Sequence, residues 1–297
     1  MVNSPQPLYP IAVLIGVTPL LFTYHRSPYL SAMLTHWLFW IGALFVVIFL
    51  RYLAFSGLYH YMLRLRLRDR LRHRIFHYEV GAGAQVQREI RRSAVVSLIF
   101  AVFGILVLYL WQNGSTRLYT KLATASDWIW LVAGTLLFLL AQETYYYWIH
   151  RWMHRPGVYE RVHQWHHESI ETTAWTAFSF HPLEAVLQAA FLPVSVLIIP
   201  MHAFAFLTLL AVMTLSATIN HAGIEVFPTR WANLPLLRGL IGATHHDVHH
   251  KQARYNFGLY FTFWDKWMGT ESPRFTERFQ RYSSRHARES KTQTQAR

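Results

Sequence analysis

The 297-residue chain contains no cysteine. Disulfide bonds, thiolate metal ligands and iron–sulfur clusters are therefore excluded, and any metal ion must be bound by histidine or carboxylate side chains. Acidic residues are also few, since 15 Asp and Glu stand against 28 Lys and Arg and give a formal net charge of +13. This charge indicates an anionic partner, which is either nucleic acid or a membrane surface.

The placement of the basic residues favours the membrane. A dense run follows a long apolar segment and consists of Arg64, Arg66, Arg68, Arg70, Arg72 and Arg74. The run lacks the interleaved aromatic residues on which bases would stack. We therefore expect anionic lipid headgroups as the partner of this surface, and no nucleic acid.

Long apolar runs predict an all-α, polytopic integral membrane protein, because 53% of the residues are hydrophobic. We expect about four transmembrane helices, at residues 11–24, 36–55, 95–111 and 128–148. The first is short for a full crossing and is either tilted or partly interfacial. An apolar region at residues 185–219, broken at Pro200-Met201-His202, predicts a helical hairpin that either spans the membrane or re-enters it.

Charge placement predicts the orientation. Residues 1–10 carry no Lys or Arg, and no small-x-small cleavage site follows, so we expect the first apolar segment to be retained and not removed as a signal peptide. The arginine run favours the cytoplasmic side. Counting the spans forward from it places the region after residue 148 on the cytoplasmic face too.

Three regions are expected along the chain. Residues 1–139 form an N-terminal transmembrane region with a cytoplasmic basic loop. Residues 140–270 form a histidine-rich helical catalytic region that includes the apolar hairpin. Residues 271–297 form a basic tail that we expect to be disordered, because it is rich in Ser, Thr, Gln and Arg.

Histidine is abundant where the other metal ligands are scarce. Twelve of the 18 histidines lie between residues 150 and 250, and eleven of them, all except His202, form a series of candidate ligands. Neutral imidazole binds divalent transition metals, and this series predicts a site for more than one metal ion. The predicted ligands are His150, His154, His163, His166, His167, His221, His246, His249 and His250, and the possible further ligands are His181 and His245.

The spacing of these histidines explains why we predict them as metal ligands. His150 and His154 are one helical turn apart at the end of the fourth span. Glu143 lies two turns earlier on nearly the same stripe, where we expect it to hold a histidine N–H and not the metal. A second helix at residues 158–168 would carry three histidines at i, i+3 and i+4 on one face, and the same pattern recurs from His246, with His245 turned about 100° away.

The remaining single histidines are less well defined. His181 and His221 flank the apolar hairpin and could both lie beside the clusters at the membrane surface. A membrane zinc hydrolase is a rival from another class, but it would need a His-Glu-x-x-His motif, and after His167-Glu168 the required position holds Glu171. A metal transporter would place its ligands at the middle of the membrane, whereas these clusters follow the spans.

Four stretches resemble a known superfamily: HRWMHRPGVYERVHQWHH, FSFHPLEAVLQ, INHAG and GATHHDVHHKQARYNFGLYFTFWDKWMGT. They are similar to the fatty acid hydroxylase/sterol desaturase superfamily of membrane non-haem iron enzymes over about residues 140–270. Within it, the sterol C5-desaturases, or lathosterol oxidases, share a histidine–proline element, here His181-Pro182. They also share an Asn-Tyr/Phe-Gly stretch and a Trp-Asp pair, here Asn256-Phe257-Gly258 and Trp264-Asp265.

The resemblance implies a di-iron oxidoreductase that uses O₂ as co-substrate and desaturates a sterol-like lipid. Zinc can replace iron in the isolated protein, since imidazole suits both metals. The resemblance also implies a separate electron donor, such as cytochrome b5 or a ferredoxin with its reductase, because the chain has no His-Pro-Gly-Gly element. His245 departs from the C5-desaturase pattern and occurs in hydroxylase members, so hydroxylation of a fatty-acyl or other lipid is the alternative.

Overall fold

A computed structural model describes residues 28–77, 83–234 and 237–284 of the chain. Contacts divide the chain into two compact units, Met1–Trp40 and Ile41–Arg297, and the first long helix passes from one unit into the other. The span expected at residues 11–24 lies outside the described residues. All the functional features below belong to the second unit.

The described residues contain four helices that are long and apolar enough to cross a membrane. These are α1 (Pro28–Tyr59, continued by a π-helix, η3, at His60–Arg66), α3 (Gly83–Gln112), α4 (Ala125–Met153) and α8 (Ala203–His221). Even the shortest has 19 residues and is about 28 Å long at 1.5 Å per residue, which matches the apolar thickness of a bilayer. The predicted all-α membrane fold and the spans at residues 36–55, 95–111 and 128–148 are thereby confirmed.

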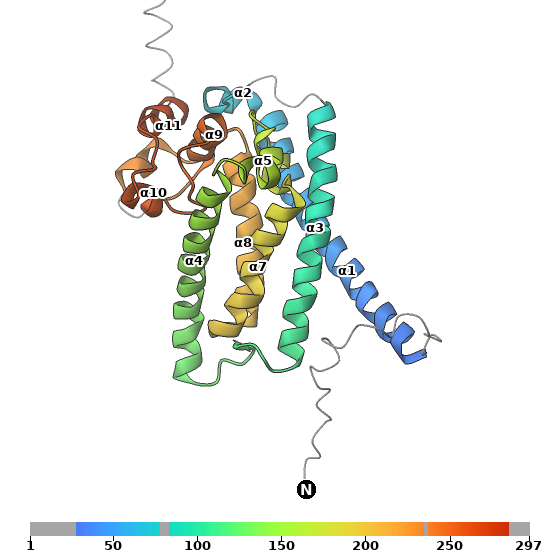
Figure 1. Ribbon diagram of the computed structural model, residues 1–297. Coiled ribbons are helices and arrows are strands. Elements are labelled where there is room, and N and C mark those ends of the chain that lie inside the picture. The colour runs from blue at the N-terminus through green and yellow to red at the C-terminus, as the bar shows by residue number, and fades with distance from the viewer. Residues whose placement is uncertain (1–27, 78–82, 235–236, 285–297) are drawn as a thin grey trace, which may run out of the picture. The chain divides into compact units, whose positions relative to one another are not determined.

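The predicted apolar hairpin consists of α7 (Pro182–Ile198) and α8, joined at a tight turn (Figure 1). Pro182 begins α7 at a position where its missing N–H costs nothing. At the turn, β2 (Met201–His202) pairs in parallel with β1 (Leu118–Tyr119), which precedes α4. A close approach to this turn requires glycine, because a Cβ on Gly134 would overlap the backbone oxygen of Pro200.

Most of the helical surface is apolar and faces outward. Only 11% to 33% of the most apolar window of each candidate span is buried in the protein, which fits helices whose outer faces contact lipid. One buried cluster joins α4, α7 and α8 around Phe138, Phe191 and Leu209. A second joins α1 and α3 to residues 177–185 around Tyr52 and Phe178.

Short helices gather at one end of the bundle, where α5, α9, α10 and α11 lie in Figure 1. They are α2 (Arg68–Leu71), η4 (Arg72–Arg74), α5 (Tyr159–Val162), α6 (Gln164–His167), η5 (Ala174–Phe178), η6 (Thr229–Asn233), α9 (Ala243–Gln252), α10 (Phe263–Trp267) and α11 (Phe275–Ser283). The helix expected at residues 158–168 is divided at His163, which leaves helical geometry with φ −120° and ψ −16°.

The beginning of the C-terminal tail is ordered, contrary to our expectation. Helix α11 has an amphipathic pattern and buries Phe279 and Tyr282. The ring of Tyr282 packs 4.5 Å from that of Phe76, near the arginine run. Composition alone did not reveal this helix, because about one apolar residue per turn of a charged segment is enough to attach it to the protein. Residues 285–297 lie outside the described residues.

Candidate metal centre

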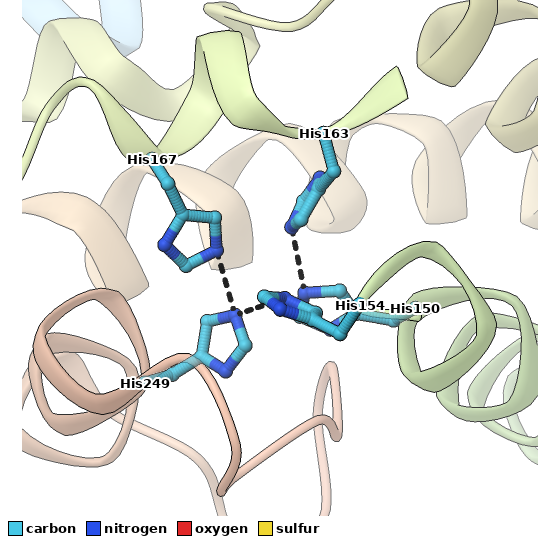
Figure 2. Close-up of side chains that lie close together, drawn as sticks. All are labelled: His150, His154, His163, His167 and His249. Atoms are coloured by element: carbon cyan, nitrogen blue, oxygen red, sulfur yellow. Dashed lines mark hydrogen bonds between the residues drawn. The ribbon is translucent and has the colours of Figure 1, made fainter. Parts of the chain in front are cut away.

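Five histidines from three segments form one cluster, shown in Figure 2. This five-histidine cluster consists of His150, His154, His163, His167 and His249. Helix α4 supplies His150, and His154 caps the end of the same helix. Residues 163–167 supply the next two histidines, and α9 supplies the last. Each ring offers one nitrogen atom, and these five nitrogen atoms all lie within 4.8 Å of one another. All of these histidines except His154 are buried.

Four more histidines form a second cluster beside the first. This four-histidine cluster consists of His166, His221, His246 and His250, all of them buried. His221 is the last residue of α8, so the end of a candidate membrane span carries a member of the cluster. The two clusters touch, since the rings of His167 and His250 stack with centroids 4.7 Å apart.

The i, i+3, i+4 triplets divide between the two clusters. His163 and His167 belong to the five-histidine cluster, whereas His166 belongs to the other. Likewise His246 and His250 share the four-histidine cluster, whereas His249 faces the five-histidine cluster. On a helix the i+3 and i+4 positions differ by about 100°, so one short helix can face two neighbouring sites. We had expected each triplet to serve a single face.

Hydrogen bonds on the outer side of the rings fix their tautomers. The backbone oxygen of Ala217 lies 2.7 Å from His221 Nδ1, and that of Tyr255 lies 2.7 Å from His249 Nδ1. The backbone oxygen of Ser179 lies 3.3 Å from His166 Nδ1. A carbonyl oxygen only accepts, so Nδ1 of each of these rings carries the proton. In a neutral ring the Nε2 atom then presents a lone pair to the cluster.

These lone pairs face one another at short range. His166 Nε2 lies 3.1 Å from His221 Nε2, and neither atom has a proton to donate. His246 Nε2 lies 2.8 Å from His221 Nε2. Nitrogens bound about 2.0–2.1 Å from one metal ion would lie roughly 2.9–3.4 Å apart. The spacing thus fits a cation held between the rings, and the two clusters fit a di-metal site.

The electrostatics of the clusters favour neutral imidazole. Burial lowers the pKa of His163, His249 and His250 well below the usual value of 6.5, and the neighbouring histidines lower it further. Burial lowers the pKa of His167 to about 3. A neutral imidazole is the form that binds metal ions, so the pocket keeps its ligands ready at neutral pH.

A buried carboxylate supports the five-histidine cluster from behind. Glu184, on α7, lies with Oε2 2.8 Å from His163 Nδ1, and its Oε1 accepts a hydrogen bond from Gln188. A carboxylate in this position fixes the ring and makes its other nitrogen a stronger ligand. The sequence placed this role on Glu143, but the hydrogen bonds that Glu143 accepts come from the backbone N–H groups of residues 259–261.

The two possible further ligands lie outside both clusters. His181 caps the start of α7, where its Nδ1 accepts from the backbone N–H of Leu183, and its ring packs on Trp165. His245 is fully buried beside Asp265, with His245 Nε2 and Asp265 Oδ2 3.6 Å apart. Burial lowers the pKa of His245 to about 3. Neither residue adds a nitrogen to the groups described above.

Known proteins are similar in sequence to this part of the chain. A family described as fatty acid hydroxylase matches residues 135–270. A Delta(7)-sterol 5(6)-desaturase of Gibberella zeae is 29% identical over 197 residues, which are 66% of this chain and 59% of that protein. Lathosterol oxidases are 32% identical in Mus musculus and 29% in Homo sapiens, over 61% of this chain and 60% of each relative.

The histidine-rich part of the chain, residues 135–270, is similar to the fatty acid hydroxylase family. The aligned part spans about 60% of the length of the Gibberella and mouse relatives. No solved structure gives a significant match. This match confirms the resemblance drawn from the histidine motifs, and the buried clusters place those motifs together in space.

The sequence did not indicate two other residues that hold the site. Arg64, which we had assigned to a lipid-facing run, points its guanidinium at the backbone oxygens of Ala222 and Gly223, directly after His221. Glu89 is buried in α3 and accepts hydrogen bonds from Ser169 and Thr176 in the segment after His167. Superfamily motifs gave no signal for either, because both lie outside the histidine strings.

Proposed function

We propose that the chain is a membrane di-metal oxidoreductase that uses O₂ and external electrons to oxidise a C–H bond of a lipid. The observation that carries this proposal is the set of facing Nε2 atoms beside an apolar cavity. We take the nine histidines of the two clusters as the metal ligands. Imidazole-only ligation suits iron, with zinc as a possible substitute in isolated protein.

The cavity gives a membrane-dissolved substrate a dry place beside the site. Its volume is about 210 Å³, and α1, α3, α4, α7 and α8 all contribute to its walls. Three of its lining residues touch the clusters. The ring of Phe180 lies 5.0 Å from that of His166, the ring of Tyr146 lies 5.0 Å from that of His150, and Ala217 holds His221.

The residues of the chain have three tasks in this function. The histidines hold the ions, and their Nδ1 partners fix the ring orientations. The apolar walls exclude water and align the lipid, which determines the carbon that reacts. Two iron ions bound here would supply O₂ activation.

The relatives favour a sterol-like substrate and desaturation. The names of the matched relatives describe Delta(7)-sterol 5(6)-desaturases and lathosterol oxidases. By analogy we propose C5-desaturase-like chemistry on a sterol-like lipid, with hydroxylation of an acyl or other lipid as the second candidate. His245 supports the second candidate only through the superfamily pattern. The cavity accepts either skeleton as far as its apolar lining is concerned.

The setting of the reaction follows from charge and chain order. We propose that the clusters face the cytoplasm, because the arginine run from Arg64 to Arg74 lies at the same end of the bundle. A separate donor such as cytochrome b5 or a ferredoxin would supply electrons there, and anionic lipids would surround it. In this proposal residues 140–270 are the catalytic region, residues 1–139 the membrane region and residues 271–297 a basic tail.

The test is mass spectrometry of lipids from cells that express the chain with a compatible reductase and receive 7-ene sterols. A loss of two mass units in the sterol pool would support desaturation, and a gain of sixteen in sterol or acyl lipids would support hydroxylation. His166→Ala should abolish either change and lower the metal content, whereas His202→Ala, at the far turn of the hairpin, should do neither. Equal, mild effects from both variants would overturn the ligand assignment.

A further inference from the structure

An arginine without a partner lines the lipid cavity. Arg51 lies in α1, within an otherwise apolar candidate span, and forms part of the cavity wall. Its Nε atom is buried and has no hydrogen-bond partner among the described residues. No carboxylate in the described part of the chain forms an ion pair with it. A charge placed among apolar side chains and left unpaired is costly, and such residues mark binding sites.

Two other polar side chains of the cavity have partners in the protein. Gln188 donates to Glu184, and Gln142 accepts from the hydroxyl of Tyr260. Arg51 differs from these two side chains, because its donors are directed at no group of the described residues. Guanidinium offers five N–H donors in a rigid fork that matches the two oxygens of a carboxylate.

Arg51 lies at the histidine end of the cavity. On α1, Tyr52 and Ser56 follow it, and their hydroxyls donate to the backbone oxygens of residues 175 and 174. The same segment continues to Ser179, whose backbone oxygen lies 3.3 Å from His166 Nδ1. Two turns earlier, Leu44 contacts Gly104, far along α3 from the histidines. A lipid whose polar end binds Arg51 would thus place this end near the metal site and extend its tail along the apolar walls.

We propose that Arg51 binds a carboxylate of the lipid substrate. This inference rests on the proposed function, since it narrows the substrate of the same site to lipids that carry one acidic group, whatever their carbon skeleton. A carboxylate is favoured over a phosphate headgroup for two reasons. One guanidinium neutralises one negative charge, and Arg51 is 15 residues from the exposed Arg66, about 22 Å along the helix from the basic surface at which hydrated headgroups lie.

Binding of radiolabelled oleate and methyl oleate to the metal-loaded, full-length protein in detergent tests the proposal. The two probes differ only in the charge of the carboxyl group. We expect oleate to bind at least ten-fold more tightly than the ester. Arg51→Gln should weaken oleate binding by about 10- to 100-fold and leave the ester unaffected, because it removes a charge-assisted hydrogen bond. Arg51→Lys should retain part of the preference.

The matched control is Arg91→Gln, which changes an exposed arginine on α3 and should bind both probes as the wild type does. Arg51→Gln should not lower the thermal unfolding temperature, since it removes an unpaired charge. Equal binding of the two probes to the wild type, no binding of oleate, or equal losses in the Arg51 and Arg91 variants would overturn the proposal. Tighter binding of dioleoyl phosphatidate than of oleate would overturn the choice of carboxylate.

These outcomes are separate from those that test the oxidoreductase. Oleate binding requires no turnover, so a protein that binds oleate through Arg51 and oxidises no lipid would overturn only the proposed function. Conversely, an Arg51→Gln protein that oxidises a neutral sterol at the wild-type rate would overturn only the carboxylate assignment.

Discussion

Replacing Glu184 by glutamine removes a negative charge from behind His163 while the side chain keeps its size. In the structure both residues are fully buried, and Glu184 Oε2 lies 2.8 Å from His163 Nδ1. The carboxylate raises the electron density of the ring, so Nε2 binds a cation more strongly. An amide at the same place can still accept the N–H, but it supplies no charge.

The expected magnitude follows from this single contact. Loss of a group that supports a ligand typically lowers metal affinity by about 10- to 100-fold, which corresponds to about 1.4–2.8 kcal/mol of binding free energy. Only the five-histidine cluster should be affected, because His163 belongs to it and Glu184 makes no hydrogen bond with a member of the four-histidine cluster in the described structure. The free energy of unfolding of the metal-free protein should not fall, since burying an amide costs less than burying a charge.

The assay is a competitive metal titration of the metal-free protein against a chelator, which resolves two binding steps. Glu184→Gln should weaken one step and leave the other unchanged. Glu225→Gln is the matched control, because Glu225 is equally buried and binds backbone N–H groups of residues 227 and 244 instead of a histidine. The reasoning would be refuted by equal weakening of both steps, or by the same selective loss in the control.

Three further predictions concern the ligands, the pH dependence and the fold. His221→Ala should lower the bound metal by about one ion per chain in elemental mass spectrometry, whereas His181→Ala should not; equal losses would contradict the assignment. In the metal-free protein, the free energy of unfolding should fall as the pH drops below 6.5, because unfolded histidine then binds a proton that folded His167, with its pKa of about 3, does not bind. The loss from this residue alone is about 1 kcal/mol between pH 7 and pH 5.5. A free energy of chemical unfolding that does not change with pH would contradict this prediction. Gly134→Ala should lower the free energy of unfolding by roughly 1–3 kcal/mol in thermal unfolding, because the added Cβ would overlap the backbone of the hairpin turn. Gly42→Ala should be tolerated, because a Cβ at Gly42 would meet no other atom. Equal effects of the two substitutions would contradict the packing described for the turn.

The membrane fold could be predicted because the composition and the length of the apolar runs determine it directly. An apolar run of about 20 residues has few alternatives to a spanning helix, and the described helices α3 and α4 contain the predicted spans. Element ends were less predictable. Helix α3 begins at Gly83, twelve residues before the predicted span, because its first turns pack on the segment after His167 through Gln85 and Glu89. Such contacts join residues 80 or more positions apart and leave no local signal.

The histidine series predicted a site for several metal ions, but it could not divide the ligands between two clusters. Spacing gives the direction of each side chain on its own helix, whereas the division depends on how the helices pack. His163 interrupts the second predicted helix, and the break changes where His163 and His166 point relative to one another. The sequence also gave no sign that Glu184, beside the His181-Pro182 element, would lie behind His163. Its assignment as a ligand-supporting group needs the hairpin to fold back on α4.

The helical stripe that contains Glu143 and His150 indicated that Glu143 supports this histidine, but it did not indicate through which contacts. It lies seven residues before His150, on nearly the same face, but about 10 Å away along the axis, which is beyond the reach of a direct hydrogen bond. Its carboxylate instead binds the backbone N–H groups of residues 259–261. Just before them, the backbone oxygen of Phe257 lies 2.9 Å from His150 Nδ1, and Asp265 binds the N–H groups of Phe257 and Gly258. Two buried carboxylates thus hold one loop from opposite sides, and the loop orients the histidine. Because the loop stands between Glu143 and His150, no pattern within α4 could have revealed this arrangement.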